Sequence, residues 1–271
     1  MRIGIVAPAR PIDPLVASRV TAFAAVAYPD VELVIHPQCF ASAGHFAGPD
    51  ELRAAAFVEQ ANDPTIDAIW FARGGYGSNR ILAEALPLLG SAAQAKTYVG
   101  YSDMGFLLSA LYARRIGRPA HGPMAIDIGR KSGDQTCART LGWITARDRQ
   151  GLEPGLGERP AVALNLSILN TLIGTPWLPD LTDHVLLIED VSEPLYRVDR
   201  MLGQMAHATQ LQGLAGIRLG AVTSVPDNDP PWAETLTAMM QRWCTEMGVA
   251  YMGRAEIGHT QTNRVVPFGI A

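Results

Sequence analysis

The sequence predicts an α/β protein: an N-terminal domain with a doubly wound, Rossmann-like parallel sheet, followed by a smaller mixed α/β C-terminal domain. Short β-branched runs alternate with segments of helical period over residues 3–121, which favours a parallel sheet with helices on both faces. The chain has 271 residues, of which 48% are hydrophobic and 18% charged, enough to bury a core without cross-links. Between residues 122 and 159 glycine, proline and charged residues become denser and the helical period fades, which indicates a junction or a long excursion.

The N-terminal elements follow from local patterns. The first strand ends where a β-branched run meets Pro8, and apolar residues at helical spacing follow it. The second helix begins at Pro49, and the strand AIWFA ends at Arg73 and two glycines. The expected order is strand 3–7, helix 14–27, strand 31–35, helix 49–60, strand 68–72, helix 79–89, strand 97–100, helix 104–115 and strand 119–121.

The C-terminal elements are a second alternating series that resumes at residue 161. We expect strand 161–165, helix 166–173, strand 185–189, helix 196–209, strand 220–225 and helix 232–247. The tail RVVPFGIA then closes this unit. The predicted domains are therefore 1–140 and 161–271, joined by a junction at 141–160.

Composition excludes several classes of function. The net charge of −4 at pH 7 provides no basic field for nucleic acid. No apolar run reaches the roughly 18 residues that a membrane span requires, and the N-terminus lacks the long apolar region of a signal peptide, so we expect a cytoplasmic protein. The three cysteines are isolated and form no CxxC pair, so we expect buried free thiols rather than a disulfide framework or a zinc site. We expect no metal and no cofactor.

The segment YVGYSDMG at 98–105 leads from a strand through a glycine and a serine directly into a helix. Such a turn lifts the hydroxyl of Ser102 clear of the sheet near the positive end of the helix, while Gly100 relieves crowding. The spacing differs from the GxSxG of lipases because Gly105 lies three residues after Ser102. Taken alone, the segment also fits Ser102 or Asp103 as a helix N-cap.

The segment FARGGYG at 71–77 follows the preceding predicted strand, at the sheet edge where open α/β proteins bind ligands. Its glycines at 74, 75 and 77 leave backbone N–H groups uncovered, which suits an oxyanion hole, a phosphate cradle or an ordinary tight turn. The segment lacks the Lys-Ser/Thr of a P-loop and the order GxGxxG, so nucleotide binding is not favoured.

Two later segments supply an acid and a base. The strand at 185–189 ends in a cluster of carboxylates, of which Glu189 comes first and is best placed to face a cleft. Asp190 or Glu193 also fits as a cap for the following helix, and Glu193 and Asp199 fit surface pairs with neighbouring arginines. His259 follows a glycine in a loop, where it is free to titrate, although an ordinary surface role also fits. The remaining histidines show no metal-ligand spacing, and we expect them to be structural or exposed.

Taken in order, FARGGYG, GYSDM, LLIEDVSEPLYRVDRML and GHT resemble the LD-carboxypeptidase family of serine peptidases. The resemblance covers essentially the whole chain and includes NLSILNTLIGTPWLPD at 165–180, which is similar to the segment that opens the family's C-terminal domain.

The resemblance implies a triad with Ser102 as nucleophile, Glu189 as acid and His259 as base. These residue types suit acyl transfer, since a serine needs a histidine to remove its proton and the histidine needs a carboxylate to fix its tautomer. The N–H groups of Asp103 and Gly75 would face the developing oxyanion.

The family's reaction is release of the terminal D-alanine from a murein tetrapeptide by hydrolysis of an L,D-peptide bond, during cytoplasmic peptidoglycan recycling. A small peptide is thus the expected substrate, and the resemblance also implies a homodimer. Recognition of a free carboxylate suits an arginine. Arg73 fits this task or a structural pair, and Gly74, Tyr76 and Asn165 are further candidates for substrate contacts.

Two departures from the family pattern bear on substrate preference. Relatives commonly carry a threonine where this chain has Gly105, and a glycine pair where it has Ala163 and Leu164. A peptidase of the microcin C immunity type, which cleaves peptidyl or aminoacyl nucleotide analogues, is the alternative within the family. It would use an aromatic platform such as Trp177 or Trp232. A non-catalytic protein that binds a ligand between two domains is the remaining alternative.

Overall fold

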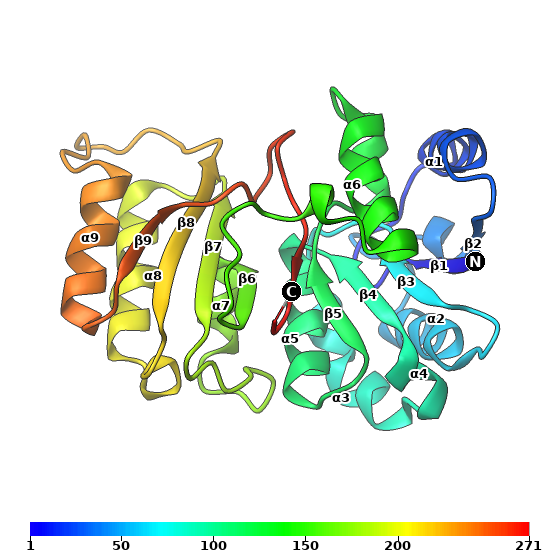
Figure 1. Cartoon of the computed structure of the whole chain (residues 1–271), viewed down its shortest axis with the longest axis horizontal. Helices are drawn as coiled ribbons and strands as arrows, with labels where there is room; N and C mark the ends of the chain where they lie inside the picture. The colour runs from blue at the N-terminus through cyan, green and yellow to red at the C-terminus, as the bar shows by residue number, and fades with distance from the viewer. Residues whose placement is uncertain (271) are drawn as a thin grey trace.

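Two β-sheets lie side by side in the computed structural model, which describes residues 1–270 (Figure 1). The first has the strand order β10-β5-β4-β3-β1-β2 and the second β6-β7-β8-β9. The strands are β1 (Arg2–Val6), β2 (Glu32–Ile35), β3 (Ala68–Phe71), β4 (Thr97–Gly100), β5 (Arg118–His121), β6 (Ala161–Asn165), β7 (Val185–Val191), β8 (Gly216–Thr223), β9 (Tyr251–Arg254) and β10 (Val266–Pro267).

Helices cover both sheets, as expected for parallel strands joined by crossovers. Asp13 caps the first helix by accepting a hydrogen bond from the backbone N–H of Leu15, and Pro14 occupies its first position. The helices are α1 (Pro14–Ala27), α2 (Asp50–Asn62), α3 (Leu82–Ala85), α4 (Ser91–Ala95), α5 (Gly105–Ala113), α6 (Gly133–Ala146), α7 (Leu166–Leu172), α8 (Leu195–His207) and α9 (Leu236–Met247). None of the helices in residues 1–270 combines the length and apolar character needed to cross a bilayer.

The predicted α/β fold class is confirmed. All pairings are parallel except that of β10 with β5, and the second sheet is parallel throughout. The predicted helix at 79–89 is wrong in its length: α3 is a single turn between two 3₁₀ segments, because Pro87 has no N–H to continue a helix. The strand β8 begins at Gly216 rather than at residue 220. Arg218 interrupts the apolar run in the sequence, and in the structure its side chain forms an ion pair with buried Glu153.

The expected loss of helical structure between residues 122 and 159 is also wrong. Helix α6 runs through this stretch and buries Cys137, Leu141 and Ile144 on one face, while glycine and charged residues interrupt the pattern on the other. The predicted boundaries at 141–160 remain predictions.

The C-terminal tail contacts both sheets. The prediction that it closes only the second unit is therefore wrong. Strand β10 pairs antiparallel with β5 of the first sheet, and Gly269 exchanges two backbone hydrogen bonds with Ala161 of β6, at 2.8 and 2.9 Å. Figure 1 shows this segment, in red, between the two sheets. Residues 266–269 thus form a seam that joins both sheets by main-chain hydrogen bonds.

The strand order places a topological switch in the first sheet. From β1 the chain moves outward to β2, then returns to add β3, β4 and β5 on the other side. The loops after β1 and β3 therefore diverge, and open α/β sheets bind their ligands in the crevice formed at such a point.

Helix α5 packs closely against the second unit at Gly105. A Cβ atom at this glycine would lie 3.2 Å from Cγ2 of Ile168 and 3.2 Å from Cδ2 of Leu164. The side chain of Leu164 therefore occupies the space beside Gly105. The two residues are complementary in volume, because a small residue in α5 faces a larger one in β6.

This packing predicts a coupling between the two positions. Gly105→Thr alone should destabilise the protein by about 1–3 kcal/mol through overpacking, and Leu164→Ala alone by about 2–5 kcal/mol through a cavity. In the double variant the added side chain enters the vacated space. The loss in free energy of unfolding, measured by urea denaturation, should therefore be smaller than the sum of the two single losses by at least about 1 kcal/mol. Leu211→Ala provides the control, because this buried leucine is not among the nearest neighbours of Gly105, and its cost should add to that of Gly105→Thr. The exchange is refuted if Gly105→Thr is additive with Leu164→Ala as well.

Candidate active site

Ser102 stands on a strained turn at the end of β4. Its φ is +60°, in the region that side chains other than glycine rarely adopt. A 3₁₀ turn over Ser102–Met104 leads directly into α5. A Cβ at Gly100 would lie 2.9 Å from Cδ2 of Phe71, so this glycine permits the close approach. Strain of about 1–3 kcal/mol at one residue is characteristic of functional turns.

The glycine turn after β3 lies against this serine. A Cβ at Gly74 would be 3.2 Å from Oγ of Ser102 and 3.4 Å from the backbone nitrogen of Asp103. The next residue, Gly75, has φ of +119°, a conformation that favours glycine. The glycine turn after β3 and the backbone nitrogen of Asp103 after β4 therefore lie beside one hydroxyl.

Asp103 holds these two segments together. Its buried carboxylate accepts hydrogen bonds from the N–H groups of Gly77 (3.3 Å) and Ser78 (2.9 Å), and its carbonyl accepts one from the Ser78 hydroxyl at 2.6 Å. Burial raises the pKa of this carboxyl, which the hydrogen bonds from Ser78 and Gly77 oppose. The residue after Ser102 thus fixes the glycine turn relative to it.

Glu189 and His259 form a close pair across the second unit. Oε2 of Glu189 lies 2.8 Å from Nδ1 of His259, and the two side chains are 0% and 14% exposed. A Cβ at Gly258 would be 3.1 Å from both Cβ and Oε2 of Glu189, so the glycine before the histidine allows this approach.

Tyr101 connects the pair to the nucleophile. Its ring, adjacent to Ser102 in sequence, lies 4.9 Å from the His259 ring, and its hydroxyl donates to Oδ1 of Asp127 at 3.1 Å. Within residues 1–270, no direct hydrogen bond joins Ser102 to His259. Catalytic hydrogen bonds often tighten only when substrate binds.

Hydrogen bonds from residues without a local sequence signal hold the loop that carries His259 against the first sheet. Oδ1 of Asn263 accepts from Gly258 N–H at 3.0 Å and lies 2.9 Å from Nε2 of His121 on β5. Because this oxygen only accepts, His121 carries its proton on Nε2. Burial lowers the pKa of His121. Arg139 of α6 also donates to the Gln261 carbonyl at 2.7 Å.

The other acids have structural partners. Glu193 pairs with Arg197 at 3.0 Å, as one of the two alternatives predicted. Asp199 pairs with Arg242 at 2.6 Å rather than with an arginine of its own helix. Asp190 does not cap α8, the first of its predicted roles, and instead accepts hydrogen bonds from Asn165 and Ser167 near α7.

Three predicted substrate-binding side chains have defined surroundings. Asn165 caps α7 through Ile168 N–H at 3.1 Å and donates to Asp190 at 2.9 Å, so its polar groups already have partners. Tyr76 is 47% exposed and lies 5.9 Å from the Phe46 ring. Nη1 of Arg73 donates to the Pro11 carbonyl at 3.2 Å.

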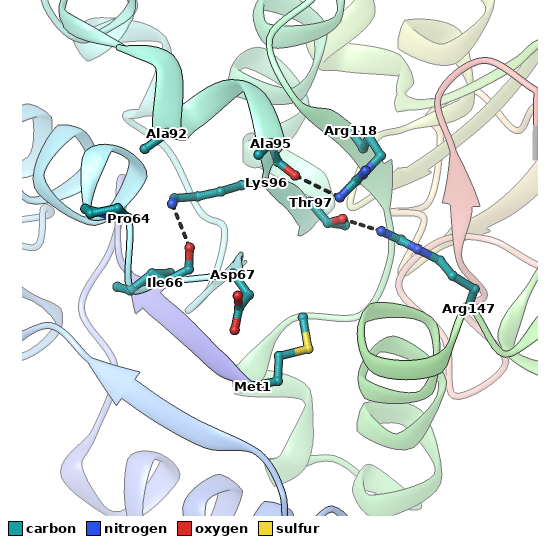
Figure 2. Close-up of a pocket in the computed structure, with 10 residues that line it drawn as sticks. All are labelled: Met1, Pro64, Ile66, Asp67, Ala92, Ala95, Lys96, Thr97, Arg118 and Arg147. Atoms are coloured by element: carbon teal, nitrogen blue, oxygen red, sulfur yellow. Dashed lines mark hydrogen bonds between the residues drawn. The ribbon is translucent and has the colours of Figure 1, made fainter.

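A cavity of about 490 Å³ lies at the opposite edge of the first sheet, near the start of β4 and β5 (Figure 2). Its cationic side chains bind the walls: Lys96 donates to the Ile66 carbonyl, Arg118 to the Ala95 carbonyl and Arg147 to the Thr97 hydroxyl, all at 2.7–2.8 Å. The chemistry-bearing side chains instead gather at the carboxyl ends of the strands. Among residues 1–270, His, Cys, Asp and Glu side chains form no cluster of three suited to a metal ion.

The role of Asn263 in fixing the loop predicts a stability effect. Asn263→Ala leaves the buried N–H groups of Gly258 and His121 without their acceptor, and should lower the free energy of unfolding by about 2–4 kcal/mol. Urea denaturation provides the measurement. Thr262→Ala, exposed on the same loop, should change it by less than about 0.5 kcal/mol; equal effects would show that Asn263 has no special part in the loop.

Comparison with known proteins places the chain in a family. A model of the LD-carboxypeptidase N-terminal domain matches residues 3–122, and a model of the LD-carboxypeptidase C-terminal domain matches residues 160–271. The murein tetrapeptide carboxypeptidase of Pseudomonas aeruginosa is 30% identical over 242 residues, covering 83% of this chain and 78% of the relative.

Two solved structures share the fold. The muramoyltetrapeptide carboxypeptidase from Oxalobacter formigenes has a TM-score of 0.79 at 24% identity, covering 98% of this chain and 93% of that one. MccF in complex with glutamyl sulfamoyl guanosine has a TM-score of 0.80 at 20% identity, with coverages of 99% and 91%. The family models match both halves of the sequence in order, and the chain therefore belongs to the LD-carboxypeptidase family of peptidases.

Proposed function

We propose that this protein is a serine carboxypeptidase that releases the terminal D-alanine from murein tetrapeptide by hydrolysing an L,D-peptide bond. The observation that carries the proposal is the buried Glu189–His259 pair, 2.8 Å apart, whose histidine ring lies against the residue preceding Ser102. The name of the Pseudomonas aeruginosa relative supports the choice of substrate.

The chemistry begins at His259. Its Nδ1–H donates to Oε2 of Glu189, so Nε2 is the unprotonated nitrogen available to accept the Ser102 proton. The serine oxygen attacks the carbonyl carbon of the L-configured residue and forms a tetrahedral intermediate. Glu189, completely buried, stabilises the imidazolium that results.

The glycine turn stabilises the negative charge that develops. The N–H groups of Asp103 and Gly75 donate to the oxyanion, and the carboxylate of Asp103 keeps their two segments in register. When the intermediate collapses, the imidazolium protonates the nitrogen of D-alanine, which leaves. A water molecule, deprotonated by His259, then hydrolyses the acyl-enzyme and regenerates Ser102.

The proposal includes a cytoplasmic role in peptidoglycan recycling and a homodimeric state. Both follow from the family resemblance of the four ordered motifs. Sedimentation of the purified protein tests the second, with a mass of twice the 29.1 kDa chain expected.

A microcin C immunity-type activity is the second candidate, supported by an aromatic cavity. Tyr196 and Trp232 line a hollow of about 480 Å³, and Nε1 of Trp232 is buried without a hydrogen-bond partner. The similarity of the fold to MccF is the other support. Faster turnover of an aminoacyl sulfamoyl adenylate than of tetrapeptide would reverse the ranking.

The first test measures free D-alanine released from tetrapeptide by the purified protein. Ser102→Ala should lower kcat by about 10⁴-fold or more, because the nucleophile is lost. Ser18→Ala, exposed on α1, serves as its control. Full activity in Ser102→Ala would refute the mechanism.

A second pair of variants tests the acid. Glu189→Gln should lower kcat by at least about 100-fold, since a neutral amide no longer stabilises the imidazolium. Glu193→Gln, which removes the ion pair with Arg197, should change kcat by less than about 3-fold. A larger loss of kcat in Glu193→Gln than in Glu189→Gln would assign the role of the acid to Glu193.

A further inference from the structure

We propose that Arg10, together with Arg73, binds the free carboxylate of the peptide substrate, and that Arg10 restricts the enzyme to peptides with a carboxylate end. This inference rests on the proposed function and specifies how that site selects its substrate. Arg10 follows β1 and Arg73 follows β3, so the two residues flank the switch point of the first sheet.

The glycine turn brings Arg10 beside the nucleophile. A Cβ at Gly75 would lie 2.7 Å from Cγ of Arg10, so the alkyl chain of Arg10 crosses this glycine. The preceding Gly74 lies against Oγ of Ser102, with a distance of 3.2 Å from its Cβ position. Consecutive glycines thus contact the serine on one side and the arginine on the other.

Buried contacts hold the two loops in this arrangement. Arg53, which is 0% exposed, donates from Nη1 to the Pro8 carbonyl in the first loop and to the Gly77 carbonyl in the second, the latter at 2.9 Å. Arg73 adds its own bond to the Pro11 carbonyl. These contacts fix the backbones of the two loops, so the exposed side chain of Arg10 begins beside the glycine turn.

Within residues 1–270, neither the Arg10 nor the Arg73 guanidinium group has a carboxylate partner to balance its charge. Within the same residues, Nε of Arg73 is buried with no hydrogen-bond partner. Burial, and secondly the charge of Arg10, lowers the pKa of Arg73. A cationic side chain without an anionic partner favours an anionic ligand.

The expected ligand is the α-carboxylate of a one-residue leaving group. One residue spans about 3.5 Å of extended chain. The carboxylate of a one-residue leaving group must therefore lie about that far from the carbonyl that Ser102 attacks. Arg10 is the candidate because its alkyl chain lies against Gly75, the residue after the glycine that contacts Ser102. Arginine also presents paired N–H donors that match the two oxygens of a carboxylate.

The test compares two tetrapeptides that differ only at the C-terminus, one with a free carboxylate and one with a carboxamide. The wild type should prefer the carboxylate in kcat/KM by about 100-fold or more. Arg10→Met should lower kcat/KM for the carboxylate peptide by about 10- to 100-fold, mainly through KM, and reduce the preference by a similar factor. Arg19→Met, exposed on α1 and without an ion pair, should retain the wild-type preference.

The outcomes separate this inference from the proposed function. An equal loss on both peptides, or an unchanged preference in Arg10→Met, would overturn the role of Arg10 while D-alanine release and its dependence on Ser102 remain. The carboxylate peptide would release D-alanine and the carboxamide peptide D-alaninamide. If the wild type releases neither product, the proposed function itself is overturned. Circular dichroism of each variant verifies that the exposed substitution leaves the fold intact.

Discussion

The seam of main-chain hydrogen bonds at residues 266–269 fixes the relation between the two sheets. Strand β10 pairs with β5, and Gly269 pairs with Ala161 at the start of β6. The first sheet carries the serine and the second the acid, so their separation depends on this connection. Main-chain bonds suit the task because their geometry varies little. Packing of α5 against Leu164 adds a second contact between the same units.

Given this frame, the site is assembled from the ends of strands. Ser102 follows β4, the glycine turn follows β3, and Arg10 follows β1, while Glu189 lies within β7. Rigid strands limit the motion of each group, and the loops between them are fastened by buried polar side chains such as Asp103. Such preorganisation is what electrostatic stabilisation of a transition state requires.

Local patterns in the sequence predict the fold class and the elements around Ser102, since strand, glycine and helix follow one another directly. The pairing of Glu189 with His259 joins residues far apart in sequence, and motif order alone suggested it. Asn263 and His121 carry no local signal, because their importance arises from contacts across the fold. Helix α6 has no clear helical period in the sequence, because only its buried face is apolar. The place of Arg10 cannot be predicted locally, because its neighbour Gly75 follows a different strand.

The seam also has a consequence for protein synthesis. A ribosome adds Ser102 long before His259, and the pairing of β5 with β10 waits until the segment after His259 has emerged. On the proposed mechanism, an unfinished chain therefore holds a nucleophile without its base. Folding of the first sheet finishes late, which lengthens the period in which the edge of β5 is unpaired and open to association with other nascent chains.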